Sequence, residues 1–279
     1  MQLLRLKYQL YCSLSLIMQI PPSPHLAHII KHYLILENNC SKQLNYRLFS
    51  DGNPGMVFYF KASLIEYEYA MHPRSFVYGQ LTQYKDLIST GELDILVVVF
   101  QPYALYALSG IASVELNDSL IKLNELFKSD AEDLEDRVLN ESDIKNKIEH
   151  IENFVFKKLT GVLYPDKILT GALKLIDNHK GNIPVSHLLN VLPITEKQLE
   201  RRFNQYIGIN PKRFTAIVKL QYFLKNLQSQ SPDTKIADAA YESGYYDQAH
   251  LNNYFKRNIG ITPSAYKTNN LLAINFMQV

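Results

Sequence analysis

Short apolar segments separated by turn residues occupy the chain from residue 44 to about residue 108. They are rich in Val, Ile, Tyr and Phe, and one of the turns is the Asp-Gly-Asn-Pro-Gly stretch at 51–55. β-Branched and aromatic residues pack well on pleated sheets, so these segments predict strands. The segments are LNYRLFS (44–50), MVFYF (56–60), SLIEYEYA (63–70), SFVYGQL (75–81) and LDILVVVF (93–100). We expect an all-β sandwich or barrel. Residues 26–37, LAHIIKHYLILE, begin with helical spacing and continue as a strand-like run.

The pattern becomes helical after Ser113. The segments NDSLIKLNELF (117–127) and DIKNKIEHIENFVFKKL (143–159) are charged, with apolar residues at helical spacing. One apolar stripe of the second segment comprises Ile144, Ile148, Ile151, Val155 and Leu159. It either packs on its own domain or pairs with a second subunit, and the pattern leaves both open. The Tyr164-Pro165 dipeptide is the expected junction with the following domain.

A short motif occurs twice near the end of the chain. RRFNQYIGINPKRF (201–214) is followed, 52 residues later, by NYFKRNIGITPSAY (253–266). Asn210-Pro211 and Thr262-Pro263 each place a capping residue before a proline, which predicts a helix start in both copies. The first of these helices is expected to run from Pro211 to about Leu227.

Each copy of the motif ends a predicted helix-turn-helix pair. In the second pair, Ala239 and Ala240 lie on the first helix, Gly244 suits a left-handed turn, and Asp247 caps a helix that buries Leu251. The first pair matches at the same offset. Leu188, Thr195 and Leu199 take the places of Ala240, Asp247 and Leu251, and Thr195 with Gln198 forms a capping box.

The second helix of each pair shows polar residues on its predicted outer face. These are Lys197, Gln198 and Arg201 in the first copy, and Gln248, His250, Asn252 and Asn253 in the second. Arg, Gln and Asn side chains read base edges in the major groove of DNA. Two such helices, joined by one long helix, would reach successive major grooves about 34 Å apart.

The distribution of charge agrees with an acidic partner for the C-terminal part. Residues 166–267 carry 14 Lys and Arg against 8 Asp and Glu, whereas residues 1–165 carry 15 against 19. A basic domain attached to an acidic one is consistent with nucleic-acid binding. The two cysteines, Cys12 and Cys40, form no disulfide framework, which favours a cytoplasmic location.

The stretches TEKQLERRFNQYIGINPKRF and GYYDQAHLNNYFKRNIGITPSAY resemble the two halves of the AraC/XylS-type DNA-binding domain. The resemblance implies a transcription regulator with a β-rich sensor domain at 18–128, a helical connector at 129–165 that could dimerise, and a double helix-turn-helix at 166–268. The expected fold class is α+β multidomain, with a β-rich sandwich or barrel and a helical connector followed by an all-α C-terminal domain. Carried over by position, the resemblance implies DNA contacts from Lys197, Gln198, Arg201, Gln248, Ala249, His250 and Asn253.

The resemblance also implies the partners of such a regulator. Double-stranded DNA is expected, a small-molecule effector and a homodimer are left open, RNA polymerase is expected if the protein activates transcription, and no membrane is expected. Residues 1–17 are expected to be an upstream extension, with Met18 as the working start.

Other classes of function have weaker support. No Walker loop, dinucleotide-binding glycine pattern or nucleophile elbow is present, so no catalytic residue and no cofactor are predicted. A metal site is a rival, because His25, His28 and His32 would share one helix face near Cys40. A partner-binding module that has lost DNA binding is another. Its support is Asn253, where the family usually has a basic residue, and Leu192-Pro193, where the family tends to have glycine.

Overall fold

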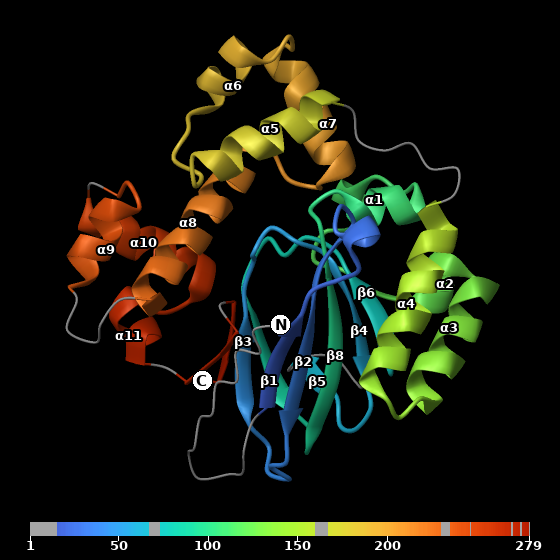
Figure 1. The fold of residues 1–279 in the computed structure, drawn as a ribbon. Coiled ribbons are helices and arrows are strands. Elements are labelled where there is room, and N and C mark those ends of the chain that lie inside the picture. Colours follow the sequence, from blue (N-terminus) through green and yellow to red (C-terminus); the bar gives the residue numbers. More distant parts are fainter. Residues whose placement is uncertain are drawn as a thin grey trace.

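A computed structural model describes residues 16–66, 73–159, 167–229, 235–245, 247–268, 270–273 and 275–278. An N-terminal β-sandwich, covered on one outer face by helices, adjoins an all-helical C-terminal domain (Figure 1). The predicted fold class is therefore confirmed.

Two antiparallel sheets form the sandwich. The first has the strand order β1 (Leu16–Ile20), β2 (Ile30–Asn38), β8 (Leu93–Phe100), β4 (Gly55–Tyr59), β6 (Ser75–Tyr78) and β9 (Leu120–Lys122). The second has the order β10 (Asn270–Ala273), β11 (Phe276–Gln278), β3 (Asn45–Leu48), β7 (Lys85–Ser89) and β5 (Leu64–Glu66). Two of the five strands in the second sheet come from the C-terminal end of the sequence.

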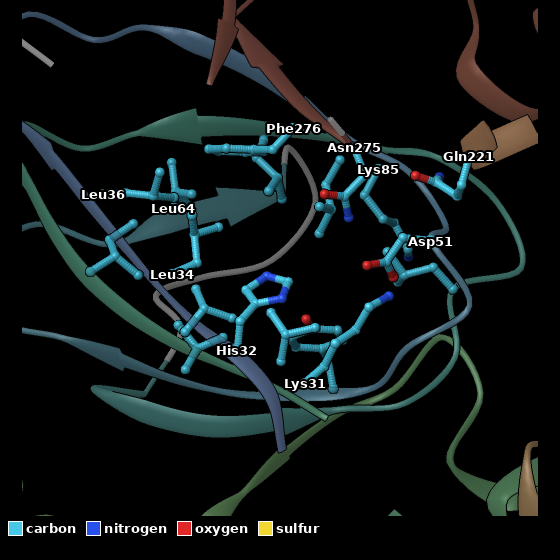
Figure 2. Close-up of a pocket in the computed structure, with 18 of the residues that line it drawn as sticks. Lys31, His32, Leu34, Leu36, Asp51, Leu64, Lys85, Gln221, Asn275 and Phe276 are labelled. Carbon is cyan, nitrogen blue, oxygen red and sulfur yellow. The ribbon is translucent and has the colours of Figure 1, made fainter. Parts of the chain in front are cut away.

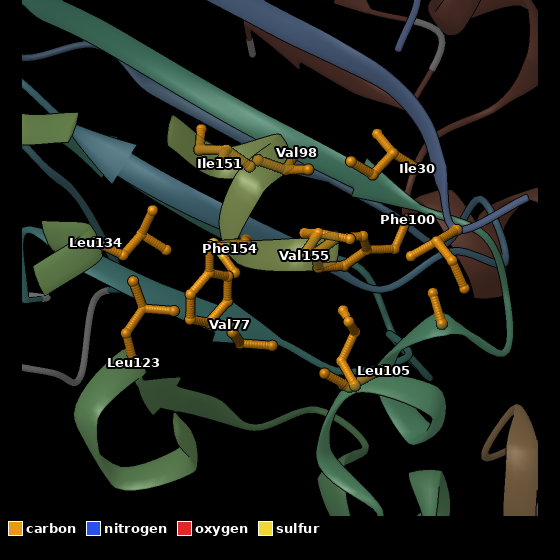
Figure 3. Packing of buried hydrophobic residues seen from close by; sticks show 14 of the residues in the cluster. Ile30, Val77, Val98, Phe100, Leu105, Leu123, Leu134, Ile151, Phe154 and Val155 are labelled. Atoms are coloured by element: carbon orange, nitrogen blue, oxygen red, sulfur yellow. The ribbon is translucent and has the colours of Figure 1, made fainter. Parts of the chain in front are cut away.

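The run LDILVVVF forms strand β8 and is apolar without the usual alternation. Successive side chains of a strand point to opposite faces, and both faces of β8 are covered. Ile95 faces the second sheet, whereas Leu96 and Val98 pack against helices on the outer side. Figure 3 shows the outer layer, where Val98 and Phe100 lie against helix α4 (Ile144–Leu159).

Helices cover the outer face of the first sheet. They are α1 (Ala104–Ser109), α2 (Leu123–Phe127), α3 (Ser129–Asn140) and α4, together with the 3-10 turns η1 (Pro24–Leu26) and η2 (Ser113–Leu116). In the stripe of α4, Ile151, Val155 and Leu159 are buried and Ile144 and Ile148 are partly buried in the same core. The stripe thus packs on its own domain, as the first of the two interpretations predicts. The Tyr164-Pro165 junction lies outside the described residues.

The C-terminal domain consists of two helix-turn-helix units joined by one helix. The elements are α5 (Lys167–Asn178), α6 (Val185–Val191), α7 (Glu196–Tyr206), α8 (Pro211–Ser229), α9 (Ile236–Glu242), α10 (Gln248–Ile259) and α11 (Pro263–Thr268). Leu188, Leu199 and Phe203 are fully buried in the first unit. Ala240 and Leu251 (1% exposed) and Phe255 (0%) are their counterparts in the second. The expected cores and the long connecting helix are confirmed.

Two local predictions were wrong. Residues 26–37 form no α-helix, because the chain leaves η1 through a turn at 27–29 and enters β2, which buries Ile30, Tyr33 and Ile35 against other strands and helices. The strand-like run predicted in the second part of this segment is present as β2. Residues 117–127 are only partly helical, since Leu120–Lys122 pair with β6 as strand β9 before α2 begins. In both places tertiary pairing overrides local spacing. The C-terminal hairpin β10–β11 was not predicted at all. Of the expected upstream extension, residues 1–15 lie outside the described residues, and Leu16 and Ile17 pair with Glu37 and Leu36 in β1–β2.

One aromatic residue of the N-terminal domain lies in the core of the second helix-turn-helix unit. Phe49, at the end of β3, is fully buried there and meets the ring of Tyr266 edge-on at 6.2 Å. Tyr266 in turn contacts Phe255 of α10 at 5.7 Å. The second unit therefore completes its core with a side chain from another domain.

We expect Phe49→Ala to lower the free energy of unfolding of the full chain by about 3–5 kcal/mol, because it leaves a cavity in a closed core. Phe156→Ala is the matched control, since Phe156 is 57% exposed, and should change it by about 0.5 kcal/mol or less. Urea unfolding of both variants measures this, and equal losses would contradict the assignment of Phe49 to that core.

Candidate nucleic-acid interface and effector cavity

The second helix of each unit begins at a well-formed cap. Thr195 accepts a hydrogen bond from the Gln198 amide, and the Gln198 side chain accepts one from the Thr195 amide at 3.2 Å, which is the predicted capping box. Asp247 accepts from the Ala249 amide at 2.8 Å. Gly244, in the turn of the second unit, has the expected left-handed backbone with φ of 78°. These caps orient the first turns of α7 and α10, where a major-groove helix makes its base contacts.

The three residues predicted to contact DNA from the first unit are exposed on α7. Lys197 and Arg201 project from its outer side, and Leu199 and Phe203 of the same helix are buried. Gln198 is also exposed, but its side-chain oxygen is held in the capping box. The Gln198 oxygen keeps a second lone pair, but the capping box fixes the orientation of its amide group. Arg201 is exposed and carries a planar guanidinium fork that pairs bidentately with guanine, so it is the stronger base-reading candidate.

The predicted contacts of the second unit lie on α10. Ala249 and Asn253 are exposed, on the side away from buried Leu251 and Phe255. Gln248 and His250 lie on the same helix, with side chains outside the described part of the structure. The structure thus divides the predicted residues into two sets on two helices.

The two units meet on α8, where the turn of the second unit lies beside the loop between α5 and α6. The Lys219 ammonium group donates to the Gly244 carbonyl at 2.7 Å and to the Asn182 side-chain oxygen at 3.3 Å, and lies 4.5 Å from the centre of the Tyr245 ring. Gly181 packs so closely on α8 that a Cβ there would collide with its backbone at Lys219. Burial lowers the pKa of Lys219. Lys219 therefore joins the α5–α6 loop to the turn of the second unit and is engaged within the protein.

The N-terminal domain contacts the C-terminal end of both recognition helices. Ser113 donates to the Tyr206 carbonyl at 2.8 Å, and Asn117 donates to the Gly208 carbonyl at 2.6 Å. On the second unit, Arg47 donates to the Ile259 carbonyl at 3.3 Å. Both repeated Ile-Gly-Ile corners are thus docking points for the N-terminal domain, which sequence reasoning did not detect. From the opposite side, Arg213 on α8 donates to the carbonyl of Thr82 in the N-terminal domain.

A cavity of about 340 Å³ lies between the two sheets of the sandwich. Figure 2 shows its apolar end, lined by Leu34, Leu36, Leu64 and Phe276. Its volume falls within the range of small-molecule sites. The signal for it in the sequence was the density of aromatic and apolar residues, which is equally typical of a filled core.

The mouth of the cavity is charged and is shared between the domains. Lys31, His32 and Asp51 come from the sandwich, and Gln221 and Lys225 come from α8. The Gln221 amide donates to the Ser50 carbonyl at 3.0 Å, which ties α8 to the loop that carries Asp51. A molecule in the cavity would therefore touch both the N-terminal domain and the helix that joins the two helix-turn-helix units.

The predicted histidine cluster is not formed. His25 lies in η1 beside Phe156, His28 lies in the following turn, and His32 lies on β2 at the cavity. They share no helix face because no helix forms there. Within the described residues, no group of three or more His, Cys, Asp or Glu side chains is placed to hold a metal ion.

Two family models match the chain. Residues 188–269 match a helix-turn-helix domain, and residues 18–122 match a domain of unknown function (DUF6597). The match at residues 18–122 covers most of the β-sandwich. Over the described ranges, none of the helices combines the length and the apolarity needed to cross a bilayer.

Two curated proteins are similar to part of the chain. An uncharacterized HTH-type transcriptional regulator of Haemophilus influenzae is 25% identical over 118 residues, which are 42% of this chain and 38% of that protein. The HTH-type transcriptional regulator MtrA of Neisseria gonorrhoeae is 27% identical over 113 residues, which are 39% of this chain and 37% of that protein. The similarity thus spans well under half the length of both relatives. Among solved structures, ToxT of Vibrio cholerae aligns with 82% of this chain and 98% of its own, at 15% identity and a TM-score of 0.46.

The histidine at the cavity predicts a dependence of stability on pH. Burial lowers the pKa of His32 from 6.5 to about 4, against a smaller opposing effect of Asp51. Between these two values the unfolded chain binds a proton that the folded protein does not, so stability falls as the pH falls from about 6.5 to about 4. We expect this loss to be roughly 2–3 kcal/mol and to be absent in His32→Gln.

Urea unfolding at several pH values measures the difference between the two proteins. His187→Gln is the control, because His187 is exposed on α6, and should retain the wild-type profile. A His32→Gln profile parallel to that of the wild type would contradict the burial of a neutral imidazole.

Proposed function

We propose that the protein is a sequence-specific DNA-binding transcription regulator of the AraC type, because residues 188–269 match a helix-turn-helix domain. The observation that carries this proposal is the pair of helix-turn-helix units joined by α8, each with an exposed polar face on its second helix. One subunit then reads two adjacent major grooves, which gives the repeated motif a function.

In this mechanism the phosphates position the protein and a few side chains specify the sequence. The proposed contacts are Lys197, Gln198, Arg201, Gln248, Ala249, His250 and Asn253. Arg201 reads a base edge, and Gln198 donates one hydrogen bond while its oxygen caps α7. Lys256 and Arg257, both exposed on α10, supply positive charge that attracts the phosphate backbone of DNA.

The cavity supports control by a small molecule. We propose residues 18–128 as the sensor, 129–165 as a connector and 166–268 as the DNA-reading domain. A ligand that binds differently before and after the domains move would shift the balance between those states. Gln221 and Lys225 on α8 line the mouth of the cavity. They leave the cavity if α8 moves, so a bound ligand has a different affinity for the two states. The proposed setting is the cytoplasm, with RNA polymerase as a partner if the protein activates transcription, and no enzymatic activity is proposed.

Selection of bound duplexes from a random pool by the full chain tests DNA recognition. The full chain is required because Phe49 completes the second unit. We expect an enriched site of two short blocks about one helical turn, or 34 Å, apart. Binding without any enriched sequence would reject specific recognition and favour a module that acts through protein partners.

We expect Arg201→Ala to weaken binding to the selected site by about 1–3 kcal/mol and to relax specificity at one base position. Arg137→Ala is the control, because Arg137 is an exposed arginine of α3 that pairs with Asp133, and should leave binding unchanged. Titration of each variant on selected and random duplexes measures both effects. An equal loss on random DNA would assign Arg201 to a phosphate.

A further inference from the structure

The C-terminal hairpin extends the second sheet of the sensor domain. Strand β11 pairs antiparallel with β3, with Phe276 opposite Leu48 and Met277 opposite Arg47. The pairing continues beyond the strands, because the Phe49 amide donates to the Asn275 carbonyl at 3.0 Å. The end of the DNA-reading domain is therefore hydrogen-bonded into the sensor domain, as the red strands beside β3 show in Figure 1.

The two faces of β11 belong to two different cores. Phe276 stacks on Tyr46 with ring centres 5.3 Å apart, and it lies in the core between the sensor sheets. Met277 points the opposite way, as the next residue of a strand must, and is fully buried beside Phe49 in the core of the second helix-turn-helix unit. The second unit cannot leave the sensor while β11 stays paired without breaking one of these cores.

The connection between the hairpin and the second unit is short. Helix α11 ends at Thr268 and β10 begins at Asn270, so little chain is available to absorb a movement of the unit. Strand β3 makes a further contact nearby, where Arg47 donates to the Ile259 carbonyl at the end of α10. The same short strand thus holds both the hairpin and the recognition helix.

The hairpin also forms part of the cavity. Phe276 lines its apolar end and Asn275 lies near its charged mouth (Figure 2). A molecule in the cavity contacts the residue that anchors the hairpin to the sensor, so its affinity depends on whether the hairpin is docked.

We propose that the hairpin β10–β11 is a latch that fixes the second helix-turn-helix unit on the sensor domain and responds, through Phe276, to what fills the cavity. The response to a ligand rests on the effector cavity proposed above. The latch itself requires no bound DNA, so it can be tested independently of DNA recognition.

The first test locks the latch. Arg47 and Met277 lie directly opposite each other on paired strands, a separation that suits a disulfide. Arg47→Cys/Met277→Cys, made with Cys12→Ser, is compared oxidised and reduced by amide hydrogen exchange of the full chain. Oxidation should slow exchange in α10 and α11 by about tenfold or more and leave α4 unchanged, because opening of the unit requires the hairpin to undock. Equal exchange in the two forms overturns the latch.

The second test changes the cavity from the far side. Leu64, on β5, lines the cavity and has no backbone pairing with the hairpin. Leu64→Phe is added to the double-cysteine variant. In the reduced form it should alter amide exchange in α10 and α11 by about threefold or more, and in the oxidised form it should leave exchange in these helices unchanged. A change that persists after oxidation, or no change in either form, overturns the link between the cavity and the latch. Ile65→Phe, from the neighbouring position on the same strand, is the matched control for a larger side chain outside the cavity lining.

Discussion

The close contact of two loops on helix α8 determines how the two helix-turn-helix units stand relative to each other. Lys219 donates to Gly244 in the turn of the second unit and to Asn182 in the loop that precedes α6 of the first unit, so one ammonium group holds both loops. Gly244 approaches Asn182 so closely that a Cβ would collide with its amide group. Gly181 packs so closely on α8 that a Cβ there would collide with the helix backbone at Lys219. A larger residue at this position cannot be accommodated without moving that backbone. The arrangement of α7 and α10, on which the proposed reading of two adjacent grooves depends, follows from this packing.

The N-terminal domain donates hydrogen bonds to polar groups that a helix leaves unsatisfied. The last carbonyls of a helix have no partner within it. Ser113, Asn117 and Arg47 donate to such carbonyls at the ends of α7 and α10, or just beyond them. These bonds exchange readily for water, whereas Phe49 and Met277 are buried in an apolar core. The first unit also contacts the N-terminal domain through the rings of Tyr106 and Tyr206, whose centres are 4.5 Å apart. The second unit differs in sharing a closed apolar core with the N-terminal domain.

The sequence was most informative where structure is determined by neighbouring residues. The capping box at Thr195, the cap at Asp247 and the left-handed Gly244 follow from residues within one turn, and the structure contains all three. The span of α8 was predicted equally well. The strand β2 was mistaken in part for a helix because its environment, not its spacing, determines its conformation. Phe49, the hairpin and the shared cavity mouth involve contacts between distant segments, for which a single sequence holds no local signal.

The shared core also bears on how the chain folds as it is synthesised. Asn275 and Phe49, which exchange hydrogen bonds between β11 and β3, are 226 residues apart. A ribosome delivers the sandwich long before it delivers this hairpin, so the edge of β3 and the ring of Phe49 emerge without their final partners. An unpaired strand edge next to an exposed aromatic ring is a template for aggregation. Until residues 270–278 are synthesised, the N-terminal domain therefore carries an open strand edge that the finished fold closes.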